Sequence, residues 1–248
     1  MSNHPRLRDL KKLSFQELYP LNEIPNDIIV KICSHIVYLV GVGRTDLSGD
    51  DFGDAFADAV NGTHYASPVG IADVGVEHIA WSAKTVKNQN PFDATAVRLI
   101  SGRNSPDYSY GIEDPHADVQ RTGDAVLGIW NERINIAFSK FKSLRTIILV
   151  RNDDLTQFTL FEEDTRQVRI ADYRWEVNKN GNFIGIEKST KKQRFTWQPH
   201  GSQFTIHTEI PLNAKKFDLK RPTPLSKNAF LVNLKYDDTW VHMLDARD

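Results

Sequence analysis

The sequence predicts a mixed α/β (α+β) fold, with a central mixed sheet flanked by helices and a β-rich C-terminal portion. Three observations indicate this class. Two early segments, residues 25–40 and 48–60, carry apolar side chains at helical spacing. A long helical pattern is followed by the apolar segment LRTIILV, residues 144–150, which is typical of a strand buried on both faces. From about residue 156 onward, short segments typical of strands follow one another.

The helices are expected from their apolar stripes and their caps. In the first, Asn26 can cap the start, and Gly41 and Gly43 can end it. In the second, Ser48 can cap a first turn that is rich in acids, with the phenylalanines facing inward. The clearest helix is TGDAVLGIWNERINIAFSKF, residues 122–141, which directly precedes the central strand.

Strands are expected between and after these helices. Residues 70–87, GIADVGVEHIAWSAKTVK, read as two antiparallel strands with Val76 and Glu77 as a two-residue turn. A short strand, VRLI, then opens a long irregular stretch that reaches residue 122. The later strands expected are TQFTLF, VRIADYRWEV, FIGIEK after the Asn180-Gly181 turn, RFTWQ, QFTIHTEI and FLVNLKY.

Composition places the chain among globular proteins. Its 248 residues, 40% hydrophobic and 25% charged, can bury a sizeable core, and they divide into residues 1–165 and a β-rich portion, 166–248, which could belong to the same domain. The single cysteine, Cys33, excludes an internal disulfide and a multi-cysteine zinc site, so a reducing cytoplasm is the expected setting. Because no uninterrupted apolar stretch follows MSNHPRLRDLKK, we expect neither a secretion signal nor a membrane span.

The charges are unevenly distributed although the net charge is only −1. Residues 1–165 hold 16 Lys and Arg against 23 Asp and Glu, whereas residues 166–235 hold 14 against 5. An acidic part that could hold cations and a basic part that could hold a polyanion is the pattern a nucleic-acid enzyme needs. Two differently solvated surfaces would give the same counts.

The hairpin in residues 70–87 contains the most informative pair of side chains. If the turn is Val76-Glu77, Asp73 faces Ala80 and shares its side of the sheet with Ser82 and Lys84. Asp73 could then bind Mg²⁺, and Lys84 could orient or deprotonate a water and neutralise charge on a phosphate. A cross-strand salt bridge with no function would have the same spacing.

The order of segments around this pair resembles the PD-(D/E)xK nuclease superfamily, and within it the type II restriction endonucleases. The resemblance covers roughly residues 48–150: an acidic helix, PVGIADV, IAWSAKTVK, a helix and a buried strand. It implies a restriction-endonuclease-like core, with Asp73 as the first-motif aspartate and Lys84 as the motif lysine. An acid of the preceding helix, Asp54, is implied as a further ligand of the cation.

Ser82 departs from the family pattern, which has Asp or Glu two residues before the lysine. A hydroxyl binds Mg²⁺ weakly, so a second carboxylate must come from elsewhere, and Glu77, Asp54 and Asp93 are the candidates. Asp54 falls opposite the phenylalanine stripe of its helix, where a solvated acidic face is the alternative interpretation.

Two segments carry side chains suited to DNA. Arginine and lysine can contact phosphates, while amides and histidine can reach base edges. Ordinary surface loops and a solvated basic hairpin would have a similar composition. The candidates are Arg98, Arg103, Asn104, Lys188, Lys191, Lys192, Arg194, Gln198, His200 and Gln203.

The function expected is therefore a Mg²⁺-dependent, sequence-specific double-stranded DNA endonuclease of the type II restriction kind. The resemblance also implies a homodimer, because a two-fold DNA site has two strands to cut. A repair or mobile-element nuclease would use the same chemistry, and a DNA-binding protein without catalysis is the alternative that Ser82 leaves open.

Overall fold

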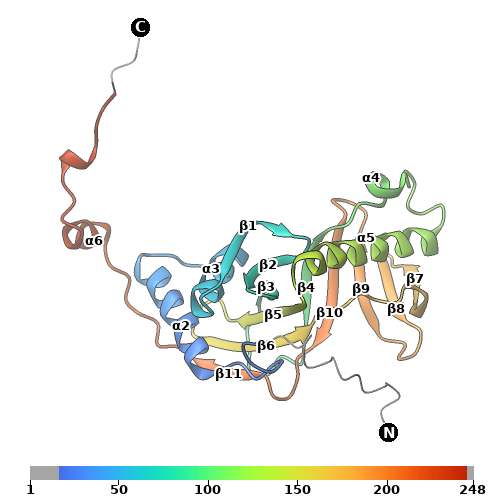
Figure 1. The fold of residues 1–248 in the computed structure, drawn as a ribbon, viewed down its shortest axis with the longest axis horizontal. Helices are drawn as coiled ribbons and strands as arrows, with labels where there is room; N and C mark the ends of the chain where they lie inside the picture. The colour runs from blue at the N-terminus through green and yellow to red at the C-terminus, as the bar shows by residue number, and fades with distance from the viewer. Residues whose placement is uncertain (1–16, 245–248) are drawn as a thin grey trace, which may run out of the picture.

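The computed structural model describes residues 17–244 and has the mixed α and β architecture that the sequence predicts (Figure 1). The N-terminal segment MSNHPRLRDLKK, for which we expect no secretion signal, lies outside these residues. Within the described part of the chain, no helix is long and apolar enough to cross a membrane. The α-helices are α2 (Asn26–Gly41), α3 (Gly49–Ala59), α4 (Pro106–Tyr110), α5 (Val119–Lys140) and α6 (Lys227–Asn233).

The strands form two sheets. The first has the order β1-β2-β3-β5-β6-β11, and the second β4-β10-β9-β8-β7. In chain order the strands are β1 (Thr63–Val69), β2 (Ala72–Val76), β3 (Ile79–Lys87), β4 (Ala96–Arg103), β5 (Ser143–Arg151), β6 (Gln157–Asp164), β7 (Tyr173–Val177), β8 (Phe183–Glu187), β9 (Gln193–Gln198), β10 (Gln203–Glu209) and β11 (Lys215–Asp218).

The first sheet is the expected central mixed sheet. β3 and β5 are parallel, and the other neighbouring pairs of this sheet are antiparallel. Helices α2 and α3 share a core with one face of the sheet, and this core includes Phe52, Phe56 and Trp81. Helix α5 packs through Val126, Trp130 and its neighbours on the other side, in a core shared with the second sheet.

The second sheet draws strands from both parts of the chain. β4 precedes residue 165 but pairs with β10, whereas β11 follows residue 166 but pairs with β6 in the first sheet. The chain therefore crosses between the sheets on both sides of residue 165, and a core that includes Leu99, Ile148 and Phe161 lies between them.

The caps agree with expectation at one helix and differ at another. Ser48 and Asp51 form a reciprocal capping box at the start of α3, as the acids of its first turn favour. Asn26 is not the cap of α2 but its first residue, preceded by Pro25 without a side-chain cap. Proline has a fixed φ and lacks an N–H, so the chain enters the helix directly after it.

The register of the β2–β3 hairpin differs from the expected one by two residues. Val76 pairs with Ile79, so the turn is Glu77-His78 rather than Val76-Glu77, and Glu77 takes a left-handed conformation with φ of 46°. Continuing this register places Asp73 opposite Ser82 instead of Ala80. Because the shift is an even number, each side chain stays on its expected face.

The segment FLVNLKY, expected to be a strand, lies instead in and after α6. Ser226 caps this helix by accepting a hydrogen bond from Ala229 N–H at 3.1 Å. The segment has left both sheets, so its backbone hydrogen bonds are made locally in a helix. Two strands were not expected from the sequence: β1 and β11, which form the edges of the first sheet.

Candidate functional site

Asp73, Ser82 and Lys84 converge as the hairpin pattern predicts. The Asp73 Oδ2 atom accepts hydrogen bonds from Lys84 Nζ at 3.0 Å, from Ser82 Oγ at 3.1 Å and from the Ala83 N–H at 2.9 Å. The side chains of Asp73 and Lys84 are 18% and 24% exposed. The pair is therefore shielded on several sides and still accessible to a ligand.

Strand pairing explains why these groups meet. β2 pairs with β3 only from Val74 onward, so the Ala83 N–H is left to bond the Asp73 carboxylate rather than a β2 carbonyl. In an extended strand the N–H and C=O of one residue point to the same side, so the Ala83 carbonyl also faces the beginning of β2. The site thus forms where the ladder between β2 and β3 ends.

The register extends this row of side chains across the sheet. Ser82 pairs with Thr146 of β5, and Thr146 pairs with Glu163 of β6, so these residues share one face with Asp73. The face is the one that turns toward α5 and the second sheet. The opposite face, through Trp81 and Ala83, packs on the helices α2 and α3, as expected.

The pair opens into a hollow of about 460 Å³ on the surface. Strands β1 to β4 and the first turn of α3 line it, so both sheets contribute. Its charged and aromatic lining includes Asp50, His64, Tyr65, Asp73, Lys84, Lys87 and Arg98. A polyanion entering the hollow would meet the cations Lys84, Lys87 and Arg98 together with the Asp73 carboxylate.

A further cation lies behind the pair. Burial lowers the pKa of Arg133 on α5, while the nearby Asp73 carboxylate acts in the opposite direction. Arg133 Nη1 donates to the Ser101 carbonyl at 2.7 Å and lies over Gly102, which has φ of 97°. A Cβ at position 102 would come within 2.8 Å of that nitrogen, so glycine allows the close approach.

Lys84 also lines a second, smaller cavity of about 240 Å³ between the two sheets. The half-buried Glu163 lies there and accepts a hydrogen bond from the Thr208 hydroxyl. Burial raises the pKa of Glu163 above that of an ordinary carboxyl group, and Arg194 opposes this shift. Lys84 therefore lies between its Asp73 partner in the first hollow and the Glu163 carboxyl group, whose pKa is raised, in the second cavity.

The other expected acids do not join Asp73. Glu77 follows β2, four residues from Asp73, which is roughly 13 Å along an extended strand, and it lines a different hollow, together with Glu17 and His78. Asp54 is 60% exposed, as its helical wheel indicates, and its Oδ1 lies 2.7 Å from His64 Nδ1. The helix acid that lines the hollow is Asp50, and Asp93 lies in a separate exposed loop.

The carboxylates at this site meet only the smallest requirement for binding a magnesium ion. Within residues 17–244, no three His, Cys, Asp or Glu side chains cluster as metal ligands. However, Mg²⁺ binds through as few as one or two carboxylates when waters and substrate phosphates complete its octahedron. All three hydrogen bonds described for Asp73 go to Oδ2, so Oδ1 is the atom that would coordinate a cation, and Asp50 lines the same hollow.

One candidate for DNA contact lies inside the protein. Asn104 is fully buried; its amide donates to the Val126 carbonyl at 3.0 Å and accepts from Arg133 Nη1 at 3.3 Å. The side chain fixes the end of β4 against α5, so the expectation that Asn104 contacts bases is wrong. Its neighbour Arg103 is exposed.

The remaining candidates lie around the second sheet. Arg98 is exposed, lines the hollow and lies opposite His207 of β10 in the strand register. In another row of the same sheet, Gln203 lies opposite both Arg103 of β4 and Gln198 of β9. Burial lowers the pKa of His207, and Arg98 and Arg194 lower it further, which keeps the ring neutral. The exposed candidates in the turns beside β9 are Lys188, Lys191, Lys192 and His200, whereas Arg194 is half-buried beside Glu163.

Sequence reasoning missed His64, Arg133, Thr146 and Glu163. Arg133, Thr146 and Glu163 reach the site through packing or pairing between elements that are distant in the chain, whereas His64 reaches it on β1, a strand that the sequence analysis did not expect. Comparisons with models of protein families, with curated proteins and with solved structures find no match for this chain.

Proposed function

We propose that the chain is a Mg²⁺-dependent, sequence-specific endonuclease that hydrolyses phosphodiester bonds of double-stranded DNA. The observation that supports this proposal is the contact of Lys84 Nζ with Asp73 Oδ2 at 3.0 Å, in a hollow that Arg98 and Lys87 also line. A carboxylate for a hard cation and ammonium and guanidinium groups for a phosphate are the parts such hydrolysis requires.

Each residue of the pair has a distinct role in this proposal. Asp73 would hold the cation through Oδ1, and bound Mg²⁺ would supply a Lewis acid and activate water. Lys84 would orient the attacking water and neutralise the charge that builds on the phosphate. Ser82 would position Asp73, because its hydroxyl donates a hydrogen bond to Oδ2. A carboxylate at position 82 would instead repel the Asp73 carboxylate.

The DNA surface is proposed to continue from the hollow onto the second sheet. Arg98 belongs to both, because it lines the hollow and pairs with His207 on β10. The Nε2 atom of His207 already bonds Thr196 Oγ1 at 2.8 Å, so a neutral His207 would offer Nδ1 to base edges rather than charge to phosphates. The exposed lysines of the β8–β9 turn would contact the DNA backbone. A homodimer is part of this proposal, because a duplex has two strands, and a reducing compartment such as the cytoplasm is its setting.

A DNA-binding protein without catalysis is the second candidate. Asp73 already accepts three hydrogen bonds, and the residues between it and Glu163 in the row across the sheet, Ser82 and Thr146, carry hydroxyls in place of carboxylates. Such a protein would use the same basic surface. A repair or mobile-element nuclease would differ from a restriction enzyme in the sites that it cuts.

Plasmid cleavage separates these functions. We expect discrete fragments with Mg²⁺, none with EDTA, and none from Asp73→Ala. Asp58→Asn is a matched control, because Asp58 is an exposed acid of α3 that does not line the hollow. Fragments of random length would favour a repair or mobile-element enzyme. A gel shift of intact plasmid, unchanged by Asp73→Ala, would favour the DNA-binding protein.

A further inference from the structure

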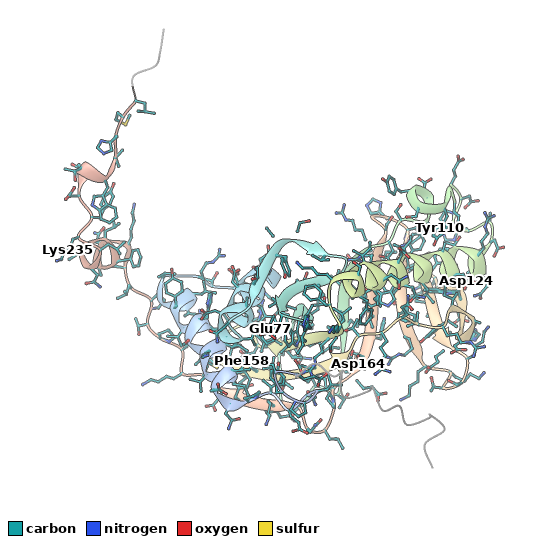
Figure 2. The ribbon with its side chains drawn as sticks, in the orientation of Figure 1. Glu77, Tyr110, Asp124, Phe158, Asp164 and Lys235 are labelled. Carbon is teal, nitrogen blue, oxygen red and sulfur yellow. The ribbon has the colours of Figure 1, made fainter. Side chains whose placement is uncertain are left out.

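The C-terminal arm, residues 226–244, leaves the body of the protein (Figures 1 and 2). Leu219 N–H bonds the Thr156 carbonyl, and Leu225 N–H bonds the Gly41 carbonyl at 2.9 Å, at the end of α2. Beyond this point, the hydrogen bonds described for the arm join its residues to one another. Figure 2 shows Lys235 of the arm well away from both sheets.

The arm exposes an apolar surface that its own fold does not bury. No residue of α6 is buried, although the arm is rich in large apolar side chains. A helix of seven residues has little stability in water without packing against another element. The apolar side chains of the arm that are at least 41% exposed are Val232, Leu234, Tyr236, Trp240, Val241, Met243 and Leu244.

Helix α2, at whose end the arm departs, has a complementary surface. Its inward face is buried in the core, but Val30 and Tyr38 on the outward side are 66% and 60% exposed, and Val42 follows at 39%. Cys33 and Val37 between them are half-buried. Exposed Lys31 and Ser34 share this outward side, so its apolar side chains form a strip among polar ones, and a partner element that covered the strip would bury it.

We propose that the arm docks on the outward face of α2 in a second copy of this chain, and that the partner's arm docks reciprocally. Each copy carries one arm and one such face, so a two-fold exchange covers both surfaces with a single kind of contact. Each chain would contribute its arm and the outward face of its α2, which together approach the roughly 20–30 residues that one side of a standard interface uses.

The geometry of the body favours exchange over folding back. The arm departs at the C-terminal end of its own α2 and is directed away from that helix (Figure 1). Helix α2 covers the face of the first sheet opposite the row of Asp73 and Ser82, and it does not line the hollow. A dimer joined through α2 therefore leaves both hollows open. The inference deepens the homodimer of the proposed function but does not depend on hydrolysis.

The mass of the full chain in solution, without DNA and with EDTA, tests the contact separately from nuclease activity. We expect twice the chain mass of 28.3 kDa. Val232→Ser with Trp240→Ser, and separately Val30→Ser with Tyr38→Ser, should each raise the dissociation constant by about 100-fold or more. Leu212→Ser is the matched control, because Leu212 is fully exposed outside both surfaces and should have no effect.

Cross-linking between mixed chains identifies the partner of the arm. In a Cys33→Ser background, one chain carries Ser34→Cys on α2 and the other carries Thr239→Cys in the arm. A flexible bismaleimide should join them at twice the chain mass, whereas Ser109→Cys on α4 in place of the arm cysteine should give no product. A monomeric chain, a dimer unaffected by the arm variants, or equal cross-linking of the α4 control would overturn the proposal.

Discussion

Replacing Asp73 by asparagine should abolish hydrolysis while costing little stability. The amide oxygen can still accept from the Ala83 N–H and the Ser82 hydroxyl, so the lost interaction is the ion pair with Lys84. An exposed pair contributes about 0.2–1 kcal/mol, and breaking a fully buried one costs about 3–5 kcal/mol. With side chains 18% and 24% exposed, this pair lies between, and we expect a loss of about 1–2 kcal/mol.

Thermal unfolding and cleavage kinetics together test this reasoning. For a domain of this size, a loss of 1–2 kcal/mol lowers Tm by roughly 2–8 °C, which leaves Asp73→Asn folded at 25 °C. Its cleavage rate with Mg²⁺ should fall by at least about 100-fold, because a neutral amide replaces the carboxylate that would hold the cation. A variant that cuts within a few-fold of the wild-type rate would refute the role assigned to Asp73, and a Tm drop far beyond this range would refute the stability estimate.

Three further predictions concern the cavity between the sheets, the packing of α5 on the second sheet and the proposed DNA surface. Burial raises the pKa of Glu163, so the folded state keeps a proton that the unfolded state releases. The free energy of unfolding therefore falls as pH rises through the raised pKa. Glu163→Gln, which cannot ionise, should raise Tm near pH ~8 but not near pH ~4. A Cβ at Gly123 would lie 2.1 Å from the Trp175 ring, so Gly123→Ala should cost about 1–3 kcal/mol in denaturant unfolding. Gly128→Ala should cost less, because its Cβ would meet the end of the exposed Tyr110 side chain, which can turn away. Arg98→Ala should reduce the slope of log Kd for DNA against log salt by about 1, and an unchanged slope would remove Arg98 from the DNA surface.

The sequence predicts the Asp73–Lys84 pair because strand periodicity alone brings the two side chains together. The turn lies one residue later than expected and the register shifts by two, yet both side chains stay on one face. The same periodicity places Trp81 against the helices. Local pattern was therefore sufficient for the part of the site that lies within one hairpin.

Residues placed by long-range packing could not be predicted in this way. Asn104 lies in a segment with the composition of a surface loop, but α5 covers its side chain and supplies the Val126 carbonyl to which its amide donates. Glu163 reaches the row of Ser82 only because β5 and β6 pair in one particular register. The segment FLVNLKY has strand-like composition, and it forms a helix because it leaves the sheets that could pair with it.

Sequencing the ends of DNA fragments tests the central claim most directly, because it reports strand cleavage and site choice together. The wild-type chain with Mg²⁺ should give ends at one short, repeated sequence, and Lys84→Met, which keeps an apolar stem but removes the ammonium, should give none while still shifting the same DNA in a gel. Identical ends from Lys84→Met, or intact DNA from the wild-type chain, would contradict the assignment of Asp73 and Lys84 as the hydrolytic pair.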